Sequence, residues 1–180
     1  AQLTRYRPDL EVEFIVGSLN ERLQMVHSGK LRGVVVAAAG IEWRGWQHLV
    51  SEVFTSAVCI PAVGQAALGV LVREGDEERA ETFSFLNHTL SRREVDCERS
   101  FYESLGAWEG APVGGLARVK GDILRIEGCV CALDGSQIIR SWAEGFPDDP
   151  LRTGERLGAK LLDLGARELL AEARSGMGLE

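Results

Sequence analysis

Cysteine and histidine are the residues of this chain that most readily supply a nucleophile or bind a metal ion. The sequence contains four cysteines and three histidines: Cys59, Cys97, Cys129, Cys131, His27, His48 and His88. Cys129 and Cys131 alternate with Val130 in a strand-like run, so their side chains are expected on one face of a sheet. A metal site needs more ligands at suitable spacing, and no histidine follows these cysteines. We predict reduced thiols, no metal site, and no catalytic role for the histidines.

The composition limits the class of protein to which the chain can belong. Its 180 residues, 45% hydrophobic and 26% charged, suffice for one or two small domains with a buried core. The net charge of −7 argues against nucleic-acid binding, because phosphates attract a positively charged surface. No apolar run approaches the ~20 residues of a membrane helix, and the start AQLTRYRPDL has no apolar signal segment. We expect a soluble, cytoplasmic protein that binds neither nucleic acid nor membrane.

The elements that must position these residues fall into two groups. Residues 1–75 alternate between short apolar runs and helical spacing, which is typical of an open, mostly parallel α/β sheet. Strands are predicted at Val12–Val16, Gly33–Ala39, Val58–Ile60 and Ala67–Val72, with helices around Leu19–Val26 and Leu49–Val53. The continuous run Gly33–Ala39 predicts a strand buried on both faces.

Residues 76–180 follow a different pattern, which predicts a small α+β domain. Helices are expected around Phe83–Leu90 and Arg92–Leu105, and again around Leu157–Leu170 with an interruption near Gly165. Between them, three strands of an antiparallel sheet are predicted around Val113–Val119, Ile123–Ala132 and Gln137–Ala143. Turns at Lys120–Asp122 and Asp134–Ser136 join the strands, and Asp-Gly is a strong hairpin signal.

Several short motifs carry a resemblance to a known family. The clearest is Pro61–Gly69, PAVGQAALG, which resembles the PAVGQGALG signature of porphobilinogen deaminase, also called hydroxymethylbilane synthase. Other stretches agree in the same order: Arg7–Leu10, Ala39–Ile41, Leu86–His88, Glu98–Arg99, Pro112–Gly114, Asp134–Arg140 and Gly165–Glu168. The ordered combination is highly specific and spans nearly the whole chain.

The resemblance implies a fold for both parts. Residues 1–75 are expected to form part of a periplasmic-binding-protein-like parallel-sheet domain, the family's middle domain with its crossover strand. Residues 76–180 are expected to form the whole third domain. The family's first domain, which carries its catalytic aspartate, is expected to lie outside this sequence.

The resemblance also implies an activity in tetrapyrrole and heme biosynthesis. Enzymes of this family join four porphobilinogen units into hydroxymethylbilane and release ammonia at each step. The growing chain is anchored on a dipyrromethane cofactor, which a loop cysteine of the third domain holds by a thioether. Arginines bind the acetate and propionate groups of the pyrroles, because guanidinium groups pair bidentately with carboxylates.

Some binding residues of the family have counterparts in this chain. Arg22 matches an arginine on the helix after the family's RGN turn, and Gly17 and Ser18 match part of that turn. Gln65 matches the glutamine of the PAVGQ turn, and Arg99 matches the arginine of the family's Glu-Arg pair. The resemblance implies that these residues bind porphobilinogen or related pyrrole carboxylates.

Other positions depart from the family pattern. Glu109 occupies the position of the cofactor cysteine, and a carboxylate forms no thioether and repels a carboxylate-rich cofactor. Val16 replaces the arginine of the RGN turn, and Ala66 replaces a glycine. Arg44 lies one place late in the A-G-L-x-R-L-G motif, which turns it about 100° away on a helix. We expect no dipyrromethane and no activity from this chain alone.

Alternatives remain at several positions. Arg22, Glu98 and Arg99 are either retained binding residues or solvated side chains on helix surfaces. Trp108 is interpreted as a cap over the core rather than a stacking platform, and Cys97 as a buried, inert thiol rather than a substitute anchor. Three functions fit: part of an enzyme completed by a chain that supplies the first domain, a non-catalytic pyrrole-binding relative, or a module that binds a partner protein.

Overall fold

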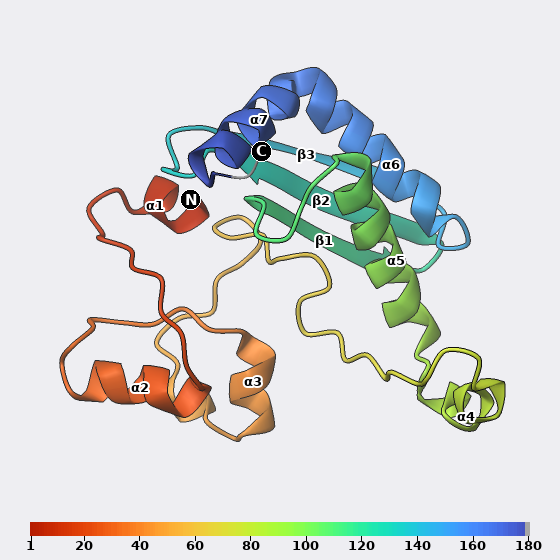
Figure 1. The fold of residues 1–180 in the computed structure, drawn as a ribbon, viewed down its shortest axis with the longest axis horizontal. Helices are drawn as coiled ribbons and strands as arrows, with labels where there is room; N and C mark the ends of the chain where they lie inside the picture. Colours follow the sequence, from red (N-terminus) through yellow and green to blue (C-terminus); the bar gives the residue numbers. More distant parts are fainter. Residues whose placement is uncertain (179–180) are drawn as a thin grey trace.

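The computed structural model describes residues 1–178 (Figure 1). Its main hydrophobic core lies in the second half of the chain. Three antiparallel strands form one sheet in chain order: β1 (Val113–Lys120), β2 (Ile123–Cys131) and β3 (Ile138–Gly145). The turns lie where the sequence predicts them. Gly121 has a φ of 57°, and the Ser136 N–H donates to Asp134 Oδ1 over 2.9 Å. The predicted three-stranded antiparallel sheet is confirmed.

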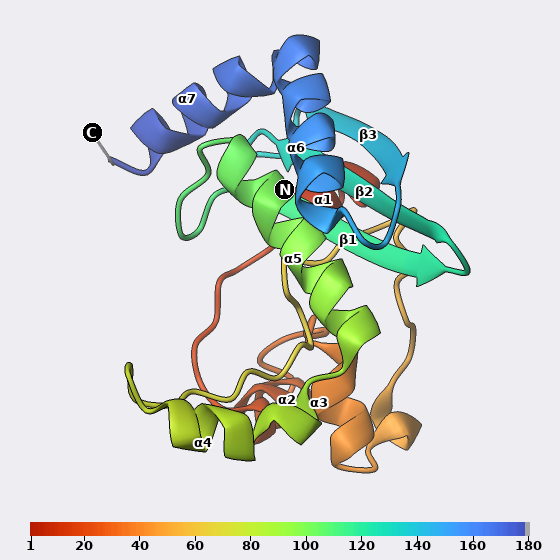
Figure 2. The same ribbon diagram turned by 90° about the vertical axis from the view of Figure 1, so that its right-hand side faces the viewer.

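Three helices cover one face of this sheet: α5 (Thr89–Ser104), α6 (Pro150–Leu161) and α7 (Arg167–Gly176) (Figures 1 and 2). The short π-helical segment η3 (Leu162–Ala166) joins α6 to α7 and bends at Gly165, where φ is 100°. The interruption predicted near Gly165 is therefore confirmed. Phe101 of α5 and Leu157 of α6 are completely buried at the centre of the core.

Glycines allow α5 and α6 to pack closely. A Cβ atom on Gly154 would collide with the backbone of α5 at Cys97 O and Phe101 N, and one on Gly158 would collide with Ser104. Gly128 of β2 makes room for the same packing, because a Cβ there would lie 2.6 Å from Phe101 Cζ. Close packing of this kind leaves no space for one added methyl group.

Side chains and the preceding loop satisfy the outer edge of β1. Its outward amides donate as follows: Gly115 to Pro61 O (2.9 Å), Ala117 to Glu98 Oε1 (2.8 Å) and Val119 to Glu94 Oε1 (2.9 Å). At the other edge of the sheet, that of β3, two cationic side chains of α6 donate to backbone carbonyls: Arg156 to Glu144 O and Lys160 to Trp142 O. The β1 edge is thereby closed to pairing with another strand, and two carbonyls of the β3 edge are occupied.

The first half of the chain contains short helices and long extended segments. The helical elements are α1 (Gln2–Tyr6), α2 (Leu19–His27), α3 (Ala38–Trp43), η1 (Gln47–Leu49), α4 (Glu77–Thr82) and η2 (Ser84–Leu86). The helix expected after Ser18 is confirmed as α2. The helix expected around Leu49–Val53 is wrong, because only the single turn η1 forms there. The helix expected around Phe83–Leu90 is also wrong, because α4 ends at Thr82, only the turn η2 forms at Ser84–Leu86, and α5 begins at Thr89.

The four strands predicted within residues 1–75 are wrong. These runs have no strand assignment, and β1, β2 and β3 form the only sheet among residues 1–178. A strand exists through hydrogen bonds to a neighbour, and no neighbouring strand pairs with these runs. Gly33–Ala39 is not buried either; Val35 is 57% exposed, and Ala38 and Ala39 belong to α3. A parallel-sheet domain therefore remains a prediction.

One segment of the first half packs firmly on the C-terminal sheet; we call residues 56–65 the strap. Ile60, 1% exposed, covers Cys129 and Cys131 on the face of the sheet opposite the helices. The Gln2 side chain pairs with both backbone groups of Ile60 at 2.8 Å. Arg140 of β3 donates to the carbonyls of residues 56 and 57. The strap therefore joins α1 to the sheet.

No helix among residues 1–178 combines the length and the apolar character that crossing a bilayer requires.

Candidate functional site

The turn before α2 brings three of the predicted binding residues together. Gly17, with a φ of 122°, turns the chain into Ser18, which caps α2. Ser18 and Glu21 bond reciprocally, and these bonds lower the pKa of the Glu21 carboxyl. Arg22 Nε donates to Gly17 O over 2.9 Å, so the guanidinium folds back onto the turn. Arg22 is half-buried beside a capped helix start, and a guanidinium in this place can pair with a carboxylate.

The strap ends in the turn that carries Gln65. Gly64 and Ala66 both have left-handed backbones, with φ of 69° and 70°. Ala66 is the only non-glycine residue with positive φ among residues 1–178, so the family's glycine at this position has a clear conformational reason. The Gly64 N–H donates to Glu98 Oε2 over 2.7 Å, which holds the turn against α5. Gln65 itself is exposed.

Arg99 and Arg44 have different surroundings. Arg99 is exposed on α5 and follows Glu98, whose side chain holds the Gln65 turn against this helix, but no hydrogen bond joins the Gln65 and Arg99 side chains within residues 1–178. Arg44 follows α3, and its guanidinium carbon lies 5.0 Å from the ring centre of Trp46. The structure joins Arg44 to neither group of predicted binding residues. The Arg22 turn and the Gln65–Arg99 region are likewise separate groups, with no hydrogen bond between them within residues 1–178.

The loop that carries Glu109 runs from the end of α5 to β1 and packs on α7. Tyr102 Oη and the Ala111 N–H both donate to Trp108 O. The Arg174 guanidinium carbon of α7 lies 5.3 Å from the Trp108 ring centre, and Trp108 packs against the core. The structure thus confirms that Trp108 caps the core.

Glu109 is exposed at the tip of this loop, and no salt bridge forms at its carboxylate within the described chain. Burial raises the pKa of the nearby Tyr102 hydroxyl, and the negative charge of Glu109 raises it further. The loop is therefore formed and held in place, but it presents a carboxylate where a thioether would require a thiol.

Three of the four thiols cannot substitute for that missing nucleophile, because they are buried. Cys97 is completely buried, and burial raises its pKa to about 12, with a smaller contribution from the charge of Glu98. Cys129 and Cys131 lie buried under the strap with their sulfur atoms 4.0 Å apart. All four cysteines are free, and only Cys59 is partly exposed. The structure confirms the prediction that Cys97 is buried.

Sequence reasoning left the role of Glu98 open, although its position contains a usable signal. Cys97, Phe101 and Leu105 mark the apolar face of α5, and Glu98 borders that face with only 5% exposure. A charged side chain at the edge of an apolar stripe requires buried partners. The structure supplies them as two backbone amides, at Gly64 and Ala117.

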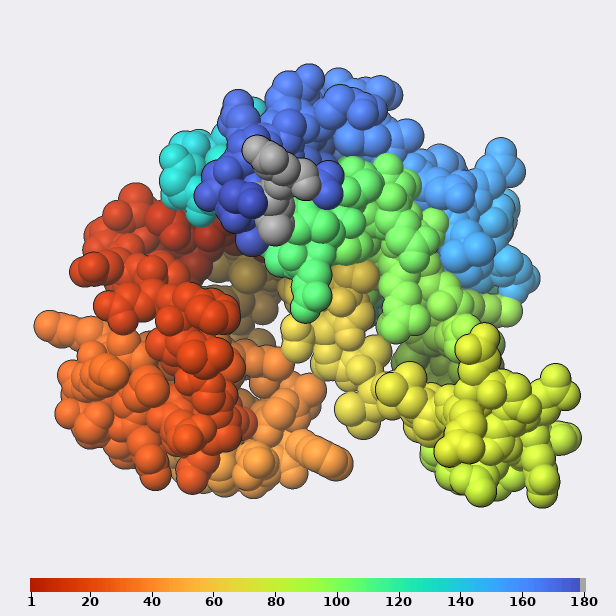
Figure 3. All heavy atoms as spheres, in the orientation of Figure 1, coloured from red at the N-terminus to blue at the C-terminus, as the bar shows by residue number. Residues whose placement is uncertain are grey.

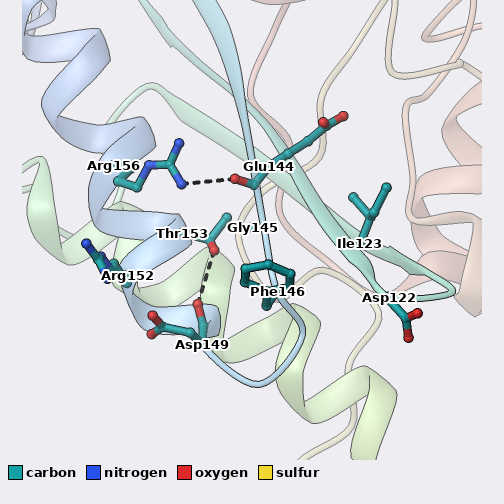
Figure 4. Close-up of a pocket in the computed structure, with 9 residues that line it drawn as sticks. All are labelled: Asp122, Ile123, Glu144, Gly145, Phe146, Asp149, Arg152, Thr153 and Arg156. Carbon is teal, nitrogen blue, oxygen red and sulfur yellow. Dashed lines mark hydrogen bonds between the residues drawn. The ribbon is translucent and has the colours of Figure 1, made fainter.

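A separate pocket lies between the end of β3 and the start of α6 (Figure 4). Arg152 and Arg156 line it together with three carboxylates, those of Asp122, Glu144 and Asp149. Arg156 donates to Glu144 O, and Thr153 donates to Asp149 O. None of the predicted binding residues contributes, and the balance of charge does not favour an anionic ligand.

Comparison with known proteins identifies the scaffold. Residues 1–81 match the family model described as porphobilinogen deaminase, dipyromethane cofactor binding domain, and residues 92–163 match the porphobilinogen deaminase C-terminal domain. The chain is 41% identical to the porphobilinogen deaminase of Pelotomaculum thermopropionicum over 174 residues, which are 97% of this chain and 56% of that protein. It is 35% identical to that of Desulforamulus reducens over 176 residues, 98% of this chain and 57% of the relative. It is 39% identical to the porphobilinogen deaminase of Syntrophus aciditrophicus over 175 residues, which are 97% of this chain and 57% of that protein.

The chain thus spans somewhat more than half the length of the relatives it matches. Two models of one family cover most of its residues, and the same name recurs among its relatives. The chain belongs to the porphobilinogen deaminase family.

Proposed function

We propose that this chain binds pyrroles that carry carboxylate groups, porphobilinogen among them, and that it does so without a covalently attached dipyrromethane. In this proposal the chain does not itself polymerise porphobilinogen to hydroxymethylbilane, and it is a pseudoenzyme built on the family scaffold. The observation that carries the proposal is Glu109. It lies at the tip of a well-packed loop, at the position that the resemblance assigns to the cofactor cysteine.

The chemistry of Glu109 does not fit dipyrromethane. Thioether formation needs a soft sulfur nucleophile, whereas a carboxylate is a hard oxygen donor and a poor trap for the cofactor's methylene carbon. The cofactor also carries several carboxylates, and a negative side chain at its attachment point opposes them. Cys97 does not replace the lost group, because it is completely buried and its pKa is raised to about 12.

The retained polar residues support noncovalent binding. Arg22 is held against its own turn by Gly17 O, which orders the guanidinium before a ligand arrives. Arg99 is exposed, with no salt bridge within residues 1–178, and it follows Glu98, which bonds to the turn that carries Gln65. Guanidinium groups bind the acetate and propionate of a pyrrole by charge-assisted hydrogen bonds, and an amide can complete the set.

A second function is favoured by the exposed apolar side chains of the first half of the chain. Phe14, Leu68 and Leu71 are 93%, 91% and 96% exposed, and Trp43 is 88% exposed. Exposed apolar side chains that form a patch mark surfaces that bind another protein, and these four all belong to residues 14–71. A partner chain that covers them, for example one that supplies a first domain, would make this chain a subunit. Light scattering after size-exclusion chromatography tests this, because a subunit of this kind elutes as a complex with its partner.

Calorimetric titration with porphobilinogen tests the main proposal. We expect saturable binding to the wild type at two sites, because the Arg22 turn and the Gln65–Arg99 region are separate groups. Arg22→Ala should weaken one site about tenfold and Arg99→Ala the other, since each loses a charge-assisted hydrogen bond. Arg152→Ala is the matched control, because Arg152 is an exposed arginine in the pocket of Figure 4, away from these residues. Absence of binding to the wild type overturns the proposal, as does an equal loss in the control.

A further inference from the structure

A single buried carboxylate connects three elements of this molecule. Glu98 extends from α5 and is only 5% exposed. Its Oε2 atom accepts from the Gly64 N–H of the strap at 2.7 Å, and its Oε1 atom accepts from the Ala117 N–H of β1 at 2.8 Å. Each oxygen therefore has its own backbone donor, and the two donors come from segments 53 residues apart in the sequence (117 − 64).

Only a carboxylate of this length satisfies both amides. A glutamine has the same size but only one acceptor oxygen, and its NH₂ group would face an N–H donor. An aspartate is one methylene shorter, so it would not reach both segments. Leaving one of these amides unpaired in a buried site costs the desolvation of that group. The geometry therefore depends on glutamate at this position.

We propose that Glu98 is a positioning residue: it holds the turn that carries Gln65 against the part of α5 that carries Arg99, and so fixes the backbone positions from which these two side chains extend. The part of this inference that concerns a ligand rests on the proposed function. The part that concerns the turn does not, because the two hydrogen bonds exist whatever the chain binds. Removing the second acceptor frees the turn while the rest of the core stays folded.

The groups around Glu98 show that its hydrogen-bond partners are backbone amides of the strap and of β1, and not a neighbouring cation. Burial raises its pKa, and the charge of Glu94 raises it further, while the two amides and the charge of Arg118 oppose that rise. Cys97 is its buried neighbour on α5. Because the nearest cation, Arg118, makes its salt bridge with Glu94 at 3.6 Å, the backbone amides are the hydrogen-bond donors to Glu98.

Glu94 provides a matched control. It lies one turn earlier on α5, and its Oε1 atom also accepts from a β1 amide, that of Val119, at 2.9 Å. Its other oxygen faces the exposed Arg118 rather than the strap. Glu94→Gln therefore keeps one acceptor for β1 and leaves the strap untouched, whereas Glu98→Gln keeps one acceptor for two amides.

Amide hydrogen exchange of the full chain tests the inference. In Glu98→Gln we expect exchange at Gly64 to accelerate about tenfold or more, because the one remaining acceptor stays with the Ala117 amide of the sheet and the strap loses its charge-assisted hydrogen bond. Acceleration at Ala117 with Gly64 unchanged would overturn the inference. Exchange at the central β2 amides, such as that of Ile126, should stay within about twofold of the wild type. Glu94→Gln should leave Gly64 unchanged. Parallel acceleration of all amides in Glu98→Gln would overturn the inference, because it would reveal a loss of global stability only.

The wild type offers the same test if Glu98→Gln does not fold. Protonation of Glu98 at acidic pH weakens one of its two bonds, so the protection of Gly64, corrected for intrinsic exchange, should fall while that of Ile126 persists. Equal protection of Gly64 at acidic and neutral pH would contradict the role of the carboxylate.

Porphobilinogen binding gives a readout that a purely structural residue would not change. We expect Glu98→Gln to weaken binding at the Gln65–Arg99 site about tenfold and Glu94→Gln to bind as the wild type does. If the wild type binds no porphobilinogen, the proposed function fails, and the exchange data still decide whether Glu98 holds the turn. Wild-type affinity in a Glu98→Gln protein with a freed turn would overturn the link to Gln65 and Arg99.

Discussion

The two halves of the chain contain similar apolar residues, but they bury them very differently. In the second half, Phe101 and Leu157 are completely buried between three helices and a sheet. In the first half, Phe14 is 93% and Leu71 96% exposed. The space-filling view shows open space between the region around α2 and α3 and the region around α4 (Figure 3). An apolar pattern specifies a buried strand or helix only where another element covers it.

The largest expected difference between the two halves comes from a pair of phenylalanine substitutions, one in each half. Phe101→Ala should lower the free energy of unfolding by about 3–5 kcal/mol, because it empties the centre of the core. Phe14→Ala removes the same kind of side chain from an exposed site and should change the free energy of unfolding by less than about 0.5 kcal/mol. Denaturant unfolding followed by circular dichroism measures both. Similar losses in the two variants would show that Phe14 is buried.

A pair of glycine substitutions tests the close packing of α5 on α6. Gly154→Ala should destabilise the protein by about 1–3 kcal/mol, since the added methyl meets the backbone of α5, although alanine favours a helix by about 1 kcal/mol. Gly33 has ordinary φ and open space at its Cβ position, so Gly33→Ala should be neutral or slightly stabilising. The same unfolding measurement applies, and a stabilised Gly154→Ala protein would mean that the helices lie further apart.

A substitution in the turn at the end of the strap should have a smaller effect on the free energy of unfolding, and it should stabilise the protein. Ala66→Gly should stabilise the protein by about 1 kcal/mol, because a left-handed backbone costs an alanine roughly that much and a glycine almost nothing. Ala67→Gly is the control and should not stabilise, since Ala67 lacks the positive φ. The shift in the unfolding midpoint at constant slope measures the effect. Destabilisation by Ala66→Gly would contradict the left-handed turn.

Thiol alkylation distinguishes the two halves without changing stability. Burial raises the pKa of Cys97 to about 12, so at pH 8 this thiol is neutral as well as inaccessible. Cys59, which is partly exposed in the strap, should react with iodoacetamide first. Peptide mass spectrometry of the native protein locates the modified residue. Modification of Cys97 before Cys59 would show that α5 opens from the core.

Sequence reasoning succeeded where local patterns and tertiary contacts agree. The three strands, the turn at Gly121 and the bend at Gly165 were predictable, because alternation, turn residues and helical spacing all indicate the structure that forms. The run Gly33–Ala39 was misleading, because an apolar run predicts a strand only if neighbours pair with it, and none does among residues 1–178.

In the candidate site, too, the local features were predictable from the sequence and the long-range contacts were not. The Gly17–Arg22 turn was predictable in outline, because a serine followed three residues later by glutamate is a local capping signal. The role of Glu98 was not, because its partners at Gly64 and Ala117 lie far away in the sequence. Backbone donors leave no trace in side-chain identity, so only the structure identifies them.

The mass of the intact chain tests the central claim, that Glu109 has removed covalent cofactor attachment. The protein should be produced in cells that make porphobilinogen and weighed under denaturing conditions, which release every noncovalent ligand. We predict a mass equal to that of the 180-residue sequence. A species heavier by one dipyrromethane would contradict the account, and peptide mapping would then identify the residue that holds it.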